Sequence, residues 1–410
     1  MSTPTSNTVL SRLALVAGAV AASTMLSACG GGGGGSSAPA PSASLGTVGV
    51  SLTDAPACGF DAVNVTVAKV RVNQSSTASD TDGGWTDITL NPARKINLLN
   101  LTNGALDALG QTPLAAGHYS QLRLVLDSNT VDPLSNSVVP TGGAETTLTT
   151  PSAVQSGIKL VNEFDVAAGQ RVDLVLDFDA CKSVVTTGSG KYLLKPVVKV
   201  IPTAINGISG FVATSLLGSH VVVSAQQNGN VISSTVPSAT GEFFLARLAP
   251  GSYDVVITAD DRAAAVVGAV PVASTTSNVA LSTAASPLSL LASTSSSIAG
   301  TFTLTPPSTT EAGFVAAKQS FAAGPLVTIK YRNADLITGA YVLDKLPTAA
   351  PQYAVYSAAL PLVFSQNVAV TPGAGKYRLD GSANGYSVKT VASVDVLSGN
   401  QTGVNFSLTP

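Results

Sequence analysis

Three aspartates spaced along one short stretch form the chain's most conspicuous group of residues that could bind a cation. Asp173, Asp177 and Asp179 fall within residues 171–179, where every second residue is apolar. This alternation predicts a strand with one buried face and the carboxylates on the other. Like charges so placed repel one another unless compensated, and Asp54 is a further residue that could join them. We favour a face of salt bridges over a cation site. The basic residues available to compensate the charge are Arg123, Arg171, Lys182 and Lys195.

A second acidic stretch has some features of a calcium loop. Asp80, Asp82 and Asp87 are interspersed with Gly83 and Gly84, but no glutamate closes the loop to complete six to eight oxygen ligands. We favour a solvated loop, and a structural calcium is the alternative. No other cofactor and no other metal site is predicted.

The two histidines give no recognisable catalytic set. His118 and His220 fall in segments that we assign to different domains, and a zinc site or a Ser-His-Asp triad needs partners that the sequence does not identify. The motifs Gly-x-Ser-x-Gly and His-Glu-x-x-His do not occur. Trp85 is the only tryptophan, and we favour a core position over a platform for sugars. The sequence therefore predicts a protein that is not an enzyme.

The first cysteine ends a segment with the order of a secretory signal. Arg12 precedes an apolar run over residues 13–25, which is too short to span a bilayer, and Leu26-Ser27-Ala28-Cys29 follows. This order resembles the bacterial lipoprotein signal peptide, in which the cysteine thiol is acylated and becomes the first mature residue. The resemblance implies export and attachment to a membrane through Cys29. Gly30 stands where similar lipoproteins carry an aspartate for inner-membrane retention, so we expect the outer membrane.

Two cysteines remain, Cys58 and Cys181. An even pair in an oxidising compartment predicts a disulfide, and the alternative is two separate buried thiols. A bridge would close a loop of more than about a hundred residues, worth on the order of 2–5 kcal/mol.

Composition limits the class of partner. Charged residues make up 11% of the 410 residues, and the formal net charge is -2. Without a basic stripe, nucleic acid is excluded as a partner. Frequent Val, Thr, Ser, Gly and Pro predict many short strands and turns, and hence an all-β fold of serial sandwiches.

Strand patterns position these residues in several domains. We expect a signal peptide over residues 1–28 and a Gly/Ser/Ala/Pro tether over 29–44. A first β domain spans residues 45–203, with strands near 46–53, 62–72, 119–126 and 171–179. A change of parity at Ala68-Lys69 predicts a bulge. A short helix or turn is expected within residues 98–109.

Two further sandwiches are expected over residues 204–297 and over 298–410, and the stretch 274–297 is expected to complete the first of them and link it to the next. The pattern Leu-x-x-Gly-x-Tyr occurs at residues 114–119 and 248–253, and a looser form ends at Tyr377. In this pattern the glycine turns into a strand, and the tyrosine packs its ring while its hydroxyl group binds backbone. Gly188-Ser-Gly-Lys191 and Gly373-Ala-Gly-Lys376 lack the full phosphate-loop motif and are predicted to be hairpin turns.

The first domain resembles a bacterial lipoprotein family known as a domain of unknown function, DUF4382. The resemblance rests on Thr53-Asp54-Ala55-Pro56, Trp85, Asn103-Gly104, residues 114–119, Leu176-Asp-Phe-Asp179 and Leu194-Lys195-Pro196. It implies a β-rich exported domain without an assigned activity.

The second domain is similar to the transthyretin-like regulatory domain of carboxypeptidases, on Gly210-Phe-Val, Gly241-Glu-Phe and residues 248–253. The third domain is also similar to this transthyretin-like type. That broader fold group includes carbohydrate-binding modules.

Three functions remain open. The first is a lipid-anchored structural or interaction module of the cell envelope, with an envelope protein or a polysaccharide as partner. Carbohydrate binding by the transthyretin-like domains is the alternative, and hydrolase activity is the least favoured.

Overall fold

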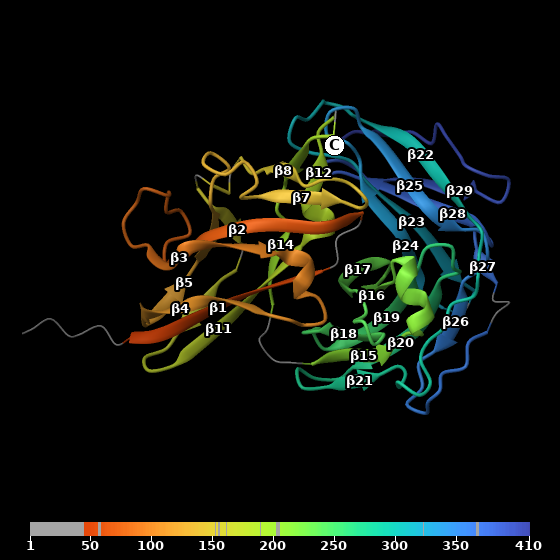
Figure 1. The fold of residues 1–410 in the computed structure, drawn as a ribbon, viewed down its shortest axis with the longest axis horizontal. Helices are drawn as coiled ribbons and strands as arrows, with labels where there is room; N and C mark the ends of the chain where they lie inside the picture. Colours follow the sequence, from red (N-terminus) through yellow and green to blue (C-terminus); the bar gives the residue numbers. More distant parts are fainter. Residues whose placement is uncertain are drawn as a thin grey trace, which may run out of the picture. The chain divides into compact units, whose positions relative to one another are not determined.

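The computed structural model describes residues 45–55, 59–151, 153–154, 156–160, 162–188, 190–201, 206–322, 324–365 and 369–410. Within these residues the regular secondary structure is almost entirely β-strand, with the short helices η1 (Leu98–Leu101), α1 (Ala180–Ser183) and η2 (Thr214–Ser219) between strands (Figure 1). This confirms the all-β fold of serial sandwiches. Residues 43–410 belong to one compact unit. Among the described residues, no helix has the length and apolar character needed to cross a membrane.

The first segment, residues 45–201, contains fourteen strands in three sheets. A four-stranded sheet has the order β14-β11-β1-β4, β10 pairs with β5, and β2 is the centre of an eight-stranded sheet. The strands are β1 (Leu45–Ala55), β2 (Phe60–Asn73), β3 (Thr86–Asn97), β4 (Asp107–Ala115), β5 (Gly117–Tyr119), β6 (Gln121–Leu126), β7 (Ser137–Pro140), β8 (Thr146–Thr149), β9 (Ile158–Leu160), β10 (Phe164–Val166), β11 (Arg171–Asp179), β12 (Val184–Thr186), β13 (Tyr192–Leu194) and β14 (Val198–Ile201).

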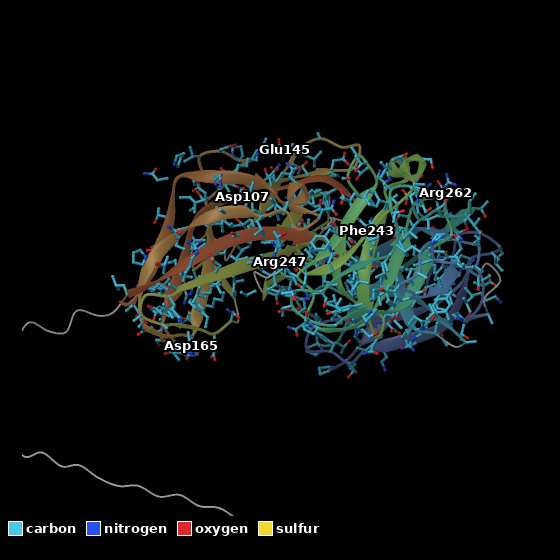
Figure 2. The ribbon with its side chains drawn as sticks, turned by 90° about the horizontal axis from the view of Figure 1, so that it is seen from below. Asp107, Glu145, Asp165, Phe243, Arg247 and Arg262 are labelled. Atoms are coloured by element: carbon cyan, nitrogen blue, oxygen red, sulfur yellow. The ribbon has the colours of Figure 1, made fainter. Side chains whose placement is uncertain are left out.

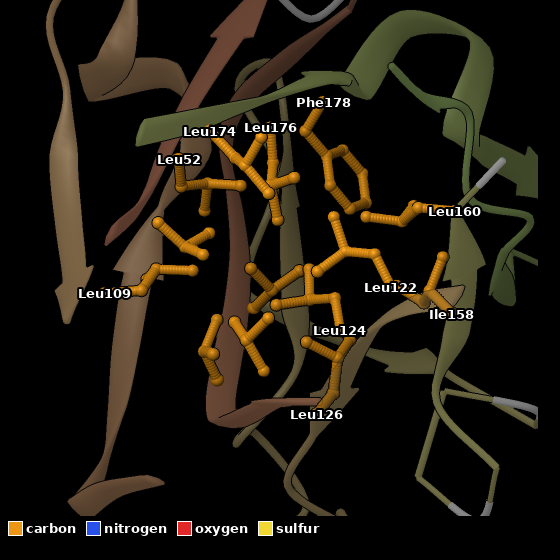
Figure 3. Packing of buried hydrophobic residues seen from close by; sticks show 14 of the residues in the cluster. Leu52, Leu109, Leu122, Leu124, Leu126, Ile158, Leu160, Leu174, Leu176 and Phe178 are labelled. Carbon is orange, nitrogen blue, oxygen red and sulfur yellow. The ribbon is translucent and has the colours of Figure 1, made fainter. Parts of the chain in front are cut away.

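The core of this segment lies between the sheets of β11 and β6. The alternating residues of β11 that were predicted to face inward include Leu176 and Phe178, which are fully buried. They meet Leu122 and Leu124 of β6 (Figure 3). Burial of such side chains contributes about 1.5–3 kcal/mol each, so this face fixes the register of β11.

The predicted bulge is present in β2. Its pairings with β3 and β6 both shift register between Val67 and Lys69. The extra residue changes which face the following side chains occupy, so Val67 and Val70 are both buried.

The second and third segments follow in chain order. The second contains β15 (Gly207–Phe211), β16 (Val222–Gln227), β17 (Asn230–Thr235), β18 (Glu242–Ala246), β19 (Gly251–Thr258), β20 (Ala265–Val272) and β21 (Asn278–Ala280). The third contains β22 (Ser295–Leu304), β23 (Phe314–Phe321), β24 (Leu326–Asn333), β25 (Ala340–Pro347), β26 (Gln352–Val355), β27 (Val370–Thr371), β28 (Lys376–Ser382), β29 (Lys389–Asp395) and β30 (Phe406–Leu408).

These two segments share one topology. In each segment, the first strand pairs antiparallel with the fourth strand in chain order and parallel with the last strand. This gives the orders β18-β15-β21 and β25-β22-β30. The facing sheets are built alike, as β17-β16-β19-β20 and β24-β23-β28-β29. The third segment is therefore a second copy of the same sandwich, with β26 and β27 added between β25 and β28.

The added strand β26 joins the two sandwiches. It pairs in parallel with β20 of the second segment, from Ala265 with Gln352 to Gly268 with Val355. Residues that follow it, including Phe364, pack against the core of the second segment. Residues 274–297 were predicted to complete the second sandwich and to link it to the third. They include β21 and the buried Leu281, Leu288 and Leu290 of that core.

The tyrosine motif forms the predicted side-chain to backbone contact. The hydroxyl groups of Tyr119 and Tyr253 donate to the carbonyls of Ala115 and Ala249, four residues earlier, at 3.0 and 2.7 Å. Tyr377 occupies the matching strand of the third segment but donates to the carbonyl of Pro347, thirty residues earlier. The long insertion changes the sequence spacing while the spatial contact persists.

We expect the substitution Tyr253→Phe to lower the free energy of unfolding by about 1–2 kcal/mol, because it removes a partly buried hydrogen bond between a buried tyrosine and the Ala249 carbonyl. Tyr253 is 1% exposed. Urea unfolding measures the change. Tyr386→Phe is the matched control, because that hydroxyl binds the Pro306 carbonyl at an exposed position. An equal loss in both variants would contradict the explanation by burial.

Candidate functional site

Three of the four predicted aspartates converge where β1 and β11 end. The two strands run parallel, with Thr53 paired to Asp177 and Ala55 to Asp179, so their carboxyl ends reach the same edge of the sheet. Asp54 lies between these pairs. Asp173 lies toward the other end, exposed, and binds Arg171 at 2.7 Å. The sequence placed Asp173 correctly on the strand but not in the cluster.

Two of the converging carboxylates are satisfied by the turn that follows β11. Asp179 caps α1, where its carboxylate accepts from the Lys182 backbone N–H at 3.0 Å and pairs with the Lys182 ammonium at 2.9 Å. Asp54 is 5% exposed, and its Oδ1 accepts from the Ala180 N–H at 3.1 Å. Lys182, one of the predicted compensating residues, therefore plays that role for Asp179.

Asp177 makes neither an ion pair nor a hydrogen bond within the described residues. Burial raises the pKa of this carboxyl to about 6, and the charge of Asp179 adds to the effect. Lys199, Lys182 and Arg247 offset part of the rise in pKa. The alternation predicted that Asp177 faces outward from the sandwich, and it does, but its face is covered by other parts of the chain.

One of the parts of the chain that cover Asp177 is the turn Asn103-Gly104, which contacts the second segment. The Asn103 side chain accepts from the Phe244 N–H at 3.0 Å and from the Thr235 hydroxyl at 2.8 Å, and it donates to the Val236 carbonyl at 2.8 Å. Its own N–H donates to Thr235 Oγ1 at 2.8 Å. Asn103 is left-handed, with φ 57°, a conformation that asparagine tolerates better than most residues.

Gly104 continues this left-handed turn and is the residue that brings the segments into contact. Its φ is +75°, and a Cβ at this position would lie 2.9 Å from the Ala246 Cβ. Its carbonyl accepts from the Arg247 guanidinium at 3.1 Å. A glycine is required here by both the backbone conformation and the close approach.

A small polar cavity lies behind this turn. Its volume is about 20 Å³, and its lining includes Asp54, Asp177 and Arg247. Arg247, labelled in Figure 2, is 6% exposed and also left-handed, with φ 58°. Such a volume suits about one water molecule. Within the described residues, no group of three or more His, Cys, Asp or Glu side chains is placed to hold a metal ion.

We name the set Thr53, Asp54, Asn103, Gly104, Asp177, Thr235, Phe244 and Arg247 the joint. It is the best-defined polar site that contains the predicted aspartates, and it links the first and second segments. Asn103-Gly104 was noted in the sequence for its family resemblance and not for a contact. No local pattern identifies its partner, because Thr235 lies 132 residues away.

A second set of contacts links the first segment to the third. The turn at residues 188–191 joins β12 to β13, as predicted, and the Gly188 N–H donates to the Asp335 carboxylate at 2.6 Å. Lys195 pairs with Glu311, and Asn333 donates to the Lys182 carbonyl at 3.1 Å. The turn at residues 373–376 is also present, closed by the Lys376 N–H and the Gly373 carbonyl at 3.1 Å.

Trp85 is half-buried and does not belong to the apolar core. The guanidinium groups of Arg71 and Arg123 lie against its ring, at 4.8 and 4.5 Å from the ring centroid. Arg123 is 1% exposed, so it does not compensate the aspartates of β11 and instead binds the Ala78 carbonyl at 2.6 Å. The preference for a core position is corrected, because cation–π contacts hold the ring at the edge of the sandwich.

Carboxylates of the acidic stretch around Trp85 bind other groups of the protein. Asp87 pairs with Lys69 and Arg71 at 2.9 and 2.8 Å. The Asp82 carboxylate accepts from the Ser79 N–H at 2.8 Å. The carboxylates thus turn to separate partners, an arrangement that matches the predicted solvated loop more closely than a calcium site.

Neither histidine belongs to the joint, and each lies against a carboxylate. His118 faces Asp165 across the pair of β5 and β10, with Nδ1 at 2.8 Å from the carboxylate, which raises the pKa of the imidazole. His220 Nδ1 lies 2.9 Å from Asp260. Within the described residues, neither histidine is hydrogen-bonded to a serine.

The lipidation and disulfide predictions fall partly outside the described residues. Cys29 and Cys58 lie among the residues that are not described, and Cys181 is the second residue of α1. The bridge between Cys58 and Cys181 therefore stays a prediction, as does acylation of Cys29.

Comparison with known proteins gives one family. Residues 45–196 match the model of a domain of unknown function (DUF4382). No curated protein matches the chain.

Solved structures resemble the chain only at low similarity. A type II cohesin–X-dockerin complex from Acetivibrio cellulolyticus is 24% identical, with 22% of this chain and 58% of that chain covered and a TM-score of 0.18. The Bacillus anthracis TIE protein is 10% identical, with 89% and 51% covered and a TM-score of 0.17. The Corynebacterium diphtheriae major pilin SpaA is 13% identical, with 89% and 100% covered and a TM-score of 0.19. The chain thus spans little more than half the length of the first two.

Proposed function

We propose that this protein is a non-enzymatic structural or interaction module of the cell envelope, attached to the membrane by lipid at Cys29. Its three β segments act together as one body that carries a binding surface and is joined to Cys29 through the Gly/Ser/Ala/Pro tether. The observation that carries the proposal is the joint. There, the Asn103 side chain satisfies backbone and hydroxyl groups of the second segment instead of its own.

Two further connections support a body that moves as one. Strand β26 of the third segment extends a sheet of the second, so the hydrogen bonds of a β-ladder would have to break before the two could separate. The Gly188–Asp335 bond adds a contact between the first and third segments. Flexible linkers between domains typically leave such backbone groups to solvent, whereas these bonds resist relative motion.

Carbohydrate binding through exposed aromatic rings is less well supported. A sugar platform needs an open ring face, and the guanidinium groups of Arg71 and Arg123 already lie against the ring of Trp85. Hydrolase activity lacks support for a different reason: each histidine is directed at carboxylates, without a serine bound to it in the described residues.

The test uses the full chain with a C-terminal tag, expressed in a bacterium that processes lipoproteins. Metabolic labelling with an alkyne fatty acid should mark the wild type and leave Cys29→Ser unlabelled, while the matched control Cys181→Ser keeps the label. Crosslinking in cells followed by purification should recover an envelope protein or polysaccharide with the wild type. An unlabelled wild type would refute the lipid attachment. Glycan binding that Trp85→Ala abolishes would replace the structural role with carbohydrate binding.

A further inference from the structure

An open charged cleft of about 470 Å³ lies apart from the joint. It is lined by the end of η2, the turn between β19 and β20, Ala292 and Lys345 of β25. Clefts of 300–1,000 Å³ are typical of small-molecule sites. Its polar lining includes Ser219, His220 and the run Asp260-Asp261-Arg262, with Arg262 labelled in Figure 2.

Each carboxylate of the cleft already has a cation beside it. Asp260 lies 2.9 Å from His220 Nδ1 and 4.0 Å from the Lys330 ammonium. Asp261 pairs with the Lys345 ammonium at 2.9 Å and accepts from the Ser295 hydroxyl at 2.6 Å. The acidic groups of the lining are therefore compensated within the protein.

Arg262 is the cation of the lining that forms no salt bridge within the described residues. In the described part of the chain its guanidinium group makes no ion pair within 4.0 Å and no hydrogen bond, although it lines the cleft. A guanidinium presents a planar set of donors that matches the two oxygens of a carboxylate or phosphate. The Arg262 guanidinium, whose charge also acts on Asp261, thus keeps its donors available to the cleft and has the geometry to bind an oxyanion.

His220 adds a hydrogen-bond acceptor to the lining of the cleft. In the tautomer that donates from Nδ1 to the Asp260 carboxylate, Nε2 of the His220 ring is an acceptor. Nε2 has no partner in the described residues and suits a hydroxyl group of a ligand. The cleft therefore offers the donors of Arg262 to an anion and the acceptor Nε2 of His220 to a hydroxyl group.

The backbone holds these groups in uncommon conformations. His220, Asp261 and Lys345, which come from three separate elements, all have positive φ values, of 49°, 58° and 54°. Such residues cost on the order of 1 kcal/mol each and persist where surrounding structure enforces them. Their meeting around one cleft indicates that its shape is built and not incidental.

We propose that this cleft binds a small hydroxylated molecule bearing one carboxylate or phosphate group, with the anion at Arg262 and a hydroxyl at His220 Nε2. An acidic sugar and a sugar phosphate both have this chemistry. The site goes beyond the proposed envelope role and does not depend on the joint or on the lipid.

Titration of the whole protein by calorimetry tests the site, with D-glucuronate, glucose 6-phosphate, inorganic phosphate and glucose as probes. We expect an anionic sugar to bind more tightly than glucose, and Arg262→Gln to weaken that binding at least about tenfold, the loss of one charge-assisted contact. Arg262→Lys should restore part of the affinity, because it keeps the charge but loses the fork. His220→Ala should weaken the sugar anion more than inorganic phosphate.

Lys389→Gln is the matched control, since that exposed lysine also makes no ion pair with any described residue but lies on β29, outside the cleft. Glucuronate binding alone identifies a carboxylate ligand, and binding of glucose 6-phosphate with inorganic phosphate identifies a phosphate ligand. Either outcome supports the proposal if Arg262→Gln abolishes it while unfolding as the wild type does. Equal loss in Lys389→Gln, equal affinity for glucose, or no binding at millimolar concentrations would overturn it. None of these results bears on the lipid label or the envelope partner.

Discussion

Replacing Asn103 with alanine should uncouple the first segment from the second and lower the free energy of unfolding by about 2–4 kcal/mol. The side chain takes part in three hydrogen bonds that cross between the segments. Each contributes about 0.5–1.5 kcal/mol, and the loss is greater where a partly buried donor such as the Phe244 N–H is left without an acceptor.

Hydrogen exchange measured by mass spectrometry is the sharpest readout. We expect faster exchange in Asn103→Ala at the Phe244 amide and along β17 and β18, because these lie against the turn. Urea unfolding should also separate into two transitions if the joint transmits cooperativity between the segments.

The matched control is Asn228→Ala. Asn228 is exposed and also left-handed, with φ 51°, so the control carries the same backbone cost without a bond between segments. Asn103→Gly provides the complementary variant, since it relieves the backbone but still removes the side chain. If Asn103→Ala and Asn228→Ala lose the same stability, strain and not the crossing bonds accounts for the effect, and the joint has no special role.

Local patterns predicted much of the fold because local rules govern it. Residues 171–179 form β11 with the predicted bounds, since alternation of apolar and polar residues is decided within the strand itself. The bulge after Val67 was visible as a change of parity, and Tyr253 makes the predicted contact with a residue only four positions away. In each case the signal and the structure lie in the same few residues.

The joint could not be predicted because its contacts join distant parts of the chain. The parallel pairing of β1 with β11, which brings Asp54 beside Asp177, links residues more than a hundred positions apart. Asn103 and Gly104 suggested only a turn, and the partner of that turn is set by how the sandwiches pack. Trp85 was misplaced for a related reason, since a buried arginine provides a second way to cover a large ring.

Asp177 carries the second large prediction, which concerns pH. Its pKa rises from 3.8 to about 6 in the folded protein. Between these values the folded state holds a proton that the unfolded state has released, so stability falls as pH rises from about 4 to 6 and then levels off. The difference between the two pKa values corresponds to about 3 kcal/mol.

Asp177→Asn should therefore stabilise the protein by about 1–3 kcal/mol at pH 7 and have little effect near pH 4. The amide resembles the protonated carboxyl and does not require a charge to be buried beside Asp179. Some of the gain is lost because Arg247, whose pKa is lowered mainly by burial, loses the attraction of this carboxylate. The measurement is urea unfolding of both proteins from pH 4 to pH 8.

Asp173→Asn is the control on the same strand. The hydrogen bond from Arg171 lowers the pKa of Asp173, so that carboxylate stabilises the fold above about pH 4 and loses its effect as pH falls through the lowered pKa. Its removal should leave the decline between pH 4 and pH 6 intact, whereas Asp177→Asn should abolish it. If Asp177→Asn instead destabilises the protein at pH 7 and the decline remains, Asp177 is held as a charged partner of Arg247. The joint would then be maintained by an ion pair, and acid would loosen the contact between the first and second segments instead of tightening it.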